Sequence, residues 1–71
     1  MTIINQETEE ILVDNVHISE GNVKLSIEHA LMSHSIDEQR VFFKKVPEFC
    51  KKKIYSKDWY WNGSKLVPYE D

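Results

Sequence analysis

Residues that crosslink, break or loosen a small fold are scarce in this 71-residue sequence, which has one cysteine, two prolines and two glycines. Because Cys50 is the single cysteine, no disulfide can form within the chain, whereas secreted domains of this size usually contain several. We therefore expect a cytoplasmic location. Two isolated glycines also exclude a glycine-rich phosphate-binding loop.

The sequence also has no long hydrophobic run. No stretch approaches the roughly 18 apolar residues of a membrane-spanning helix, and the N-terminus has neither the positive charge nor the apolar segment of a signal peptide. We therefore expect no contact with a membrane. The length allows a single domain, residues 1–71, with a small core. Such a domain has little room for an enclosed ligand cavity, which disfavours an enzyme and a small-molecule substrate.

Motifs of catalysis, cofactor binding and metal binding are missing as well. His17, His29 and His34 match no zinc spacing, and there is no Cys-x-x-Cys. Cys50 falls on an apolar stripe, so we interpret it as a buried hydrophobic residue. We predict a non-enzymatic protein with no cofactor and no metal. From the short length, the Lys-, Ile- and Asn-rich usage and the absence of catalytic motifs, we expect an accessory protein of a phage, plasmid or other mobile element.

What the chain does have is an uneven distribution of charge. Residues 1–39 contain eight acids and one base, and residues 40–65 contain eight bases and two acids, although the whole chain has a net charge of −3. Every aromatic residue also lies after position 41. Such asymmetry can mark an interaction surface. Alternatively, the two halves fold against each other and their charges intermingle.

The N-terminal part predicts a β-hairpin. We expect the mostly polar residues 1–8 to be frayed. Residues 9–19 are rich in β-formers, and residues 23–28 alternate between apolar and polar side chains, which is the pattern of a half-buried strand. Turn-forming residues 19–22 lie between the two runs and favour a hairpin. A competing interpretation is a helix from Asn22, because apolar side chains also recur at helical spacing there.

The middle of the chain predicts a capped helix that a proline interrupts. The sequence Ser-Ile-Asp-Glu, from Ser35 to Glu38, has the form of a capping box. Downstream, apolar residues recur at spacings of three and four from Phe43 to Ile54. Pro47 lies inside this stripe. Either the helix kinks there, or a second short helix begins with the proline at its first position.

The C-terminal segment predicts a second hairpin. The Asn-Gly pair at residues 62–63 lies between β-formers, which is the strongest short-range hairpin signal. A two-residue loop puts Trp59, Trp61 and Leu66 on one face, whereas a three-residue loop with a bulge shifts the pairing by one. We expect that face to pack inward on the central helix. Pro68 ends the second strand or holds it at a sheet edge.

These patterns together predict an α+β fold: an N-terminal β-hairpin, a central capped and Pro-kinked helix, and a C-terminal β-hairpin. For function, we expect a small regulatory or interaction module that binds a partner protein or forms a homodimer. The alternative is a nucleic-acid-binding protein that uses the Lys- and aromatic-rich C-terminal half, although the acidic total charge argues against a dedicated one. The candidate partner-binding residues are Lys44, Lys45, Lys51, Lys52, Lys53, Tyr60, Lys65 and Tyr69.

Overall fold

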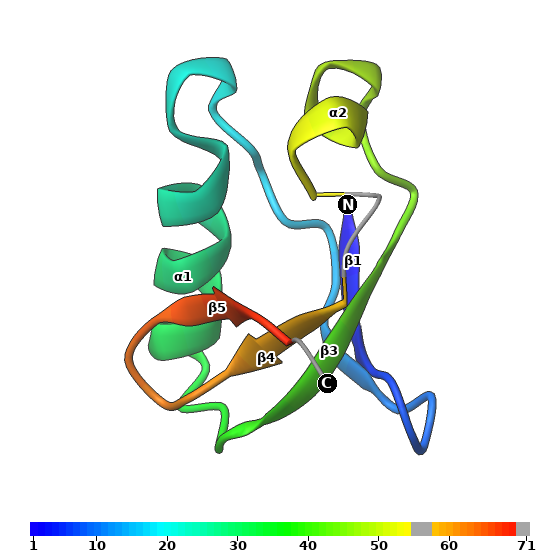
Figure 1. Cartoon of the computed structure of the whole chain (residues 1–71), viewed down its shortest axis with the longest axis vertical. Helices are drawn as coiled ribbons and strands as arrows, with labels where there is room; N and C mark the ends of the chain where they lie inside the picture. The colour runs from blue at the N-terminus through cyan, green and yellow to red at the C-terminus, as the bar shows by residue number, and fades with distance from the viewer. Residues whose placement is uncertain (55–57, 70–71) are drawn as a thin grey trace.

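A five-stranded antiparallel sheet with the strand order β2-β1-β3-β4-β5 organises the chain (Figure 1). The computed structural model describes residues 1–54 and 58–69. Its elements are β1 (Thr2–Asn5), β2 (Ile11–Val13), α1 (Val23–Ser33), β3 (Gln39–Lys44), α2 (Lys51–Ile54), β4 (Trp59–Trp61) and β5 (Leu66–Pro68). One-turn 3-10 helices, Glu20–Asn22 and Glu48–Cys50, precede α1 and α2. The predicted α+β class is confirmed, as is its order of hairpin, helix and hairpin.

The first hairpin uses earlier residues than predicted. It joins β1 to β2, so the expectation that residues 1–8 are frayed is wrong for Thr2–Asn5. The reason is that β1 lies inside the sheet, where it pairs with β2 on one side and with β3 on the other. Ile3 faces the core with no exposed surface, and Ile4 is buried on the opposite face. Burial on both faces offsets the entropy lost in ordering the terminus.

Residues 23–33 form a helix, so the predicted strand at residues 23–28 is wrong and the competing helix is correct. Val23, Ile27 and Leu31, at spacings of four, are the buried residues of α1. Leu25, which the strand pattern placed with the core residues, is 47% exposed. The same run satisfies both periods, and only packing of the helical stripe against the sheet decides between them.

The Ser-Ile-Asp-Glu sequence ends a helix and does not start one. Ser35 has a φ of 53°, in the left-handed region. Its amide donates to the Met32 carbonyl, and the Ile36 amide donates to the Leu31 carbonyl, both at 3.1 Å. This is the Schellman arrangement, which satisfies the last carbonyls of a helix, here those of α1. The capping-box prediction is therefore wrong, because a preceding helix claims the same residues.

The predicted long helix at residues 36–54 is replaced by β3 and the short helix α2. In β3, Val41 and Phe43 point into the core, whereas Phe42 between them is 41% exposed. Pro47 does not kink a helix; it is the residue before the 3-10 turn that leads into α2. That position is close to the predicted alternative of a short helix beginning at the proline, and it needs no amide hydrogen.

The C-terminal hairpin is confirmed, with a longer loop than expected. Trp61 pairs with Leu66, so the loop has four residues, 62–65. Within it, the Asn62 side chain accepts hydrogen bonds from the amides of Ser64 and Lys65, and Gly63 takes a φ of 94°. The loop is therefore set by the side-chain bonds of Asn62. β5 is an edge strand that ends at Pro68, as predicted.

Both indoles point inward, as expected. Trp61 is fully buried and Trp59 is 7% exposed. Each donates its indole N–H to a carbonyl at 2.8 Å: Trp61 to Ile36, just after α1, and Trp59 to Ile54, at the end of α2. The core that these bonds close contains Ile3, Val13, Val16, Ile18, Val23, Ile27, Leu31, Val41, Phe43, Cys50, Ile54, Trp59, Trp61 and Leu66. Both helices contribute buried residues to it, so they cover the same face of the sheet.

Replacing Trp61 tests its role in closing the core. We expect Trp61→Ala to cost about 3–5 kcal/mol, comparable to the whole stability of a domain at roughly 0.05–0.15 kcal/mol per residue. Circular dichroism should therefore show a largely unfolded variant. Trp61→Phe keeps much of the packing but leaves the Ile36 carbonyl without its donor, so we expect a smaller loss of about 1–3 kcal/mol. A Trp61→Ala variant with wild-type stability would contradict this role.

Ser35 provides a stabilising substitution. Because a non-glycine residue is strained at its left-handed φ, we expect Ser35→Gly to stabilise the fold by about 0.5–1 kcal/mol. For a domain of this size the melting temperature should rise by about 4–8 °C per kcal/mol. Ser33→Gly is the matched control, because Ser33 lies within α1, where glycine lowers stability. If the melting temperature of Ser35→Gly falls as much as that of the control, the Schellman assignment is refuted.

Candidate functional site

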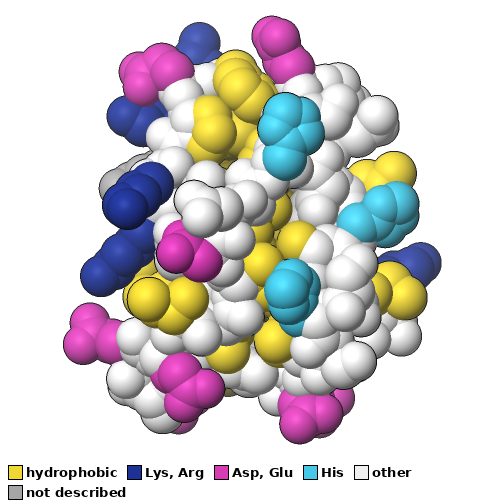
Figure 2. All heavy atoms as spheres, turned by 180° about the vertical axis from the view of Figure 1, so that it is seen from behind, with side chains coloured by type: hydrophobic (Ala, Val, Ile, Leu, Met, Phe, Trp, Pro, Cys, Tyr) yellow, Lys and Arg dark blue, Asp and Glu magenta, His cyan; other side chains and the backbone are white. Residues whose placement is uncertain are grey.

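The predicted partner-binding residues do not form one patch. Lys44 and Lys45 lie at the end of β3, whereas Lys51, Lys52 and Lys53 are on α2. Tyr60 belongs to β4, Lys65 to the last loop, and Tyr69 follows β5. Figure 2, a view from behind, shows several basic side chains along one edge of the molecule and another at the opposite edge. Lys44, Lys45, Tyr60 and Tyr69 lie on or beside the uncovered face of the sheet, and Lys53 and Lys65 line a groove on the helix side. Lys51 and Lys52 line neither surface.

The uncovered face of the sheet is rich in apolar and aromatic side chains. Strand register places Ile4 opposite Phe42 and Ile11, and Tyr60 opposite Arg40 and Val67. None of the described helices covers these side chains, because both helices pack on the other face. We call this surface the aromatic face; it comprises Ile4, Ile11, Arg40, Phe42, Tyr60, Val67 and Tyr69. Ile11, Phe42 and Tyr69 are 60%, 41% and 40% exposed.

Arg40 and two tyrosines form an ordered group on the aromatic face. The Arg40 guanidinium carbon lies 4.3 Å from the centre of the Tyr69 ring, a cation–π geometry. The Tyr60 and Tyr69 rings have centroids 5.9 Å apart. Asp58 holds the other side of Arg40 in an ion pair at 3.5 Å. Partial burial raises the pKa of Tyr60, and the nearby Glu38 carboxylate adds to this rise. The phenol is therefore a neutral hydrogen-bonding group.

The other end of the aromatic face has a hollow of about 260 Å³, lined by Thr2, Ile4, Glu9, Ile11, Asp14, Lys44 and Lys45. The Thr2 hydroxyl donates to the Asp14 carboxylate at 2.8 Å, and the Asn15 amide donates to it at 2.9 Å. These two bonds lower the pKa of Asp14. The hollow thus combines apolar walls with charges of both signs.

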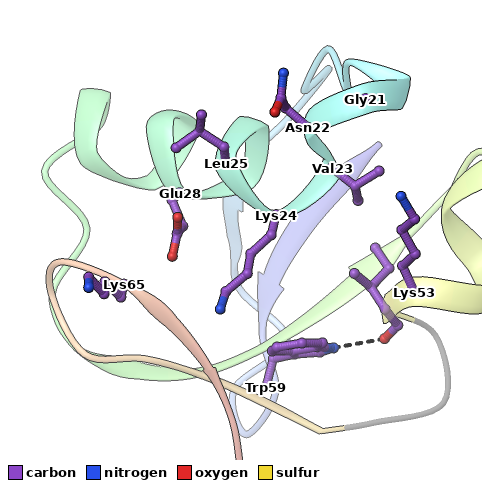
Figure 3. A pocket seen from close by; sticks show the side chains of 10 residues that line it. Gly21, Asn22, Val23, Lys24, Leu25, Glu28, Lys53, Trp59 and Lys65 are labelled. Carbon is purple, nitrogen blue, oxygen red and sulfur yellow. Dashed lines mark hydrogen bonds between the residues drawn. The ribbon is translucent and has the colours of Figure 1, made fainter.

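A second surface is a groove of about 570 Å³ between the start of α1, the end of α2 and the C-terminal hairpin. Lys24, Lys53 and Lys65 come to its walls from these three places, and the Trp59 indole lies across its floor (Figure 3). We call it the lysine groove. Glu28 also lines it, but its carboxylate accepts the Leu66 amide at 2.7 Å.

Sequence reasoning identified Tyr60 and Tyr69 but missed Phe42, Arg40 and Lys24. The sequence pattern predicts a helix around Phe42. In a helix, a buried Phe43 does not require Phe42 to be exposed. Once residues 39–44 are a strand, two adjacent aromatic residues must point to opposite faces. The adjacent pair of Phe42 and Phe43 was therefore the sequence signal that one phenylalanine lies on the uncovered face.

No arrangement for metal or thiol chemistry stands out in residues 1–54 and 58–69. No group of three or more His, Cys, Asp and Glu side chains in these ranges could hold a metal ion. The histidines are separated from one another in the view of Figure 2. Cys50 has no exposed surface, and its burial raises the pKa of the thiol. A buried neutral thiol is a poor nucleophile.

Comparison with known protein families, with curated proteins and with solved structures gave no match to this chain. Over the part of the chain that the structure describes, no helix has the length and apolar character needed to cross a membrane. The physical character of the two surfaces therefore carries the functional argument.

Asp14, which lines the hollow of the aromatic face, makes the stability of the fold depend on pH. Its lowered pKa means that the unfolded chain, with an Asp pKa of about 3.9, takes up the proton first. The stabilisation is complete above that value and is lost as the pH falls through the lower folded-state pKa. We expect urea unfolding midpoints to fall less in Asp14→Asn than in the wild type between about pH 6 and about pH 2.5.

Thr2→Val is the companion variant, because it removes the hydroxyl donor and keeps the side-chain shape. It should weaken the same pH dependence in part, since the Asn15 amide still donates to the carboxylate. Parallel decreases in all three proteins would contradict the role assigned to Asp14.

Proposed function

We propose that this chain is a non-enzymatic protein-interaction module that binds the apolar surface of a folded partner protein through its aromatic face. The observation that carries the proposal is the uncovered sheet face on which Ile11, Phe42 and Tyr69 remain exposed. Exposed apolar side chains that adjoin one another on a rigid surface are typical of interaction sites.

The composition of the aromatic face supports a protein partner. Aromatic residues and arginine are enriched among the residues that dominate binding energy at protein interfaces. Here Arg40 is already ordered by Tyr69 and Asp58, so less side-chain entropy is lost on binding. The side chains also project from paired strands, which hold them in fixed relative positions. The partner surface that fits is an apolar patch with a mixed-charge rim.

The charges around the aromatic face disfavour a nucleic acid as the partner. Among the described residues on or beside this face, the acids outnumber the bases: Glu9, Asp14, Glu38 and Asp58 against Arg40, Lys44 and Lys45. Binding to a phosphate backbone depends on an excess of cations that displace condensed counterions. Lys51, Lys52 and Lys53 lie on α2, on the opposite side of the sheet, and add nothing to this face.

A comparison of the proteins captured by the wild type and by a variant tests the proposal. Immobilised wild-type protein is exposed to extract of the organism that encodes it, beside the double variant Phe42→Ser, Tyr69→Ser. We expect the double variant to capture about tenfold less partner protein than the wild type, or even less. A tenfold loss of affinity corresponds to about 1.4 kcal/mol of binding free energy, and truncation of interface anchors often costs more. Met32→Ser is the matched control, because Met32 is 56% exposed but lies on α1.

Two further measurements accompany the capture experiment. Melting curves must show that both variants remain folded at the temperature of capture. Parallel extracts are treated with nuclease, and capture that disappears there would assign the face to nucleic acid and refute the proposal. Equal capture by the double variant and the wild type, or no specific capture at all, would also refute it.

A further inference from the structure

The lysine groove concentrates positive charge that no ion pair between described residues compensates. Among the described side chains, Lys24, Lys53 and Lys65 take part in no ion pair. Within residues 1–54 and 58–69, Glu28 is the one acid that lines the groove, and the Leu66 amide already donates to one of its oxygens. Figure 3 shows the three ammonium groups spread along the groove and not converging on one point. The groove therefore suits a ligand whose negative charges are spaced apart.

The β1–β2 turn of the same chain carries such a set of charges. Glu7, Glu9 and Glu10 are all exposed, and within the described residues none of them forms an ion pair. We call residues 7–10 the acidic turn. Its three carboxylates equal in number the three ammonium groups of the groove.

The acidic turn is rigid before any contact is made, because Asn5 builds it. The Asn5 side-chain oxygen accepts the amides of Glu7 and Thr8 at 2.7 and 2.8 Å. The Asn5 backbone bonds to Glu9 and Glu10, each at 2.9 Å. Glu9 takes a φ of 62°, which tightens the turn. A preorganised turn loses little conformational entropy when it docks.

Within one copy the two features cannot meet. Figure 1 places the β1–β2 turn at the opposite end of the molecule from the first turn of α1, which borders the groove. No residue of the acidic turn lines the groove. Complementary charges on two separate surfaces of one chain match a head-to-tail contact between copies.

We propose that the acidic turn of one copy docks into the lysine groove of a second copy. The contact goes beyond the proposed function, because it uses neither Phe42 nor Tyr69. Glu9 also borders the hollow of the aromatic face, so the variants below change Glu7 and Glu10 and leave Glu9 in place, which keeps the two tests separate. Because exposed ion pairs are weak and are screened by salt, the association is weak and sensitive to ionic strength.

Analytical ultracentrifugation of the full chain tests the proposal. At low salt we expect the weight-average mass to rise with concentration and to return toward the monomer value at about 0.5 M sodium chloride, where the Debye length has fallen to roughly 4 Å. A monomer at the highest concentration reached would overturn the proposal.

Reciprocal charge reversal gives the sharper result. We expect Lys24→Glu, Lys65→Glu to be monomeric because its groove is acidic, and Glu7→Lys, Glu10→Lys to be monomeric because its turn is basic. An equimolar mixture should regain association, since each variant then offers what the other lacks. If the mixture stays monomeric while the wild type associates, the pairing is wrong.

The change in net charge needs its own control. Asp37→Lys, Glu48→Lys changes the net charge by the same amount as the turn variant, at exposed acids outside the acidic turn. Because this control keeps both the acidic turn and the lysine groove, we expect it to associate with itself as the wild type does, whereas the turn variant of equal net charge is monomeric. A monomeric control would show that net charge alone decides association and would overturn the proposal.

Discussion

Two indole hydrogen bonds hold the C-terminal hairpin against the ends of both helices. Trp61 donates to the residue that follows the left-handed turn after α1, and Trp59 donates to the last residue of α2. The Trp59 bond satisfies a carbonyl at the end of α2, the Trp61 bond satisfies one just beyond α1, and each gives a buried indole N–H its partner. Because both helices are held on the same side, the opposite side of the sheet stays uncovered. The candidate surface for a partner is therefore a consequence of how the core is closed.

Local sequence patterns predicted those parts of the fold that depend on interactions between residues close together in the sequence. Asn62, Gly63 and the alternation of Trp59 and Trp61 determined the second hairpin and its inward face. The first half of the chain depends on distant partners. β1 is ordered by strands on both sides, one of which begins 34 residues after β1 ends, and residues 23–28 satisfy two periods at once. Residues 35–38 could cap a following helix or end a preceding one, and only the presence of α1 decides.

The candidate surfaces were predictable to a similar extent. The hairpin pattern predicted that Tyr60 and Tyr69 lie on the partner-binding surface, because alternation along the strand puts Tyr60 on the other face of the sheet from the tryptophans. The lysines are close in sequence and so suggest one patch, but a strand, a helix and a loop direct them to different sides of the sheet. Lys24 joins Lys65 only through the packing of α1 on the hairpin, a long-range contact that no local pattern encodes.

The bond between Glu28 and the Leu66 amide limits how the sheet can grow. β5 is an outer strand, and strands of that kind recruit a further strand from another molecule through their free amides. Here a carboxylate from α1 occupies one such amide, and Pro68 has no amide hydrogen to offer. A strand arriving on this side would have to displace a charged acceptor and would still find a missing donor. Fibrillar stacking from β5 is thereby disfavoured, which leaves the β2 side as the edge where a further strand could add.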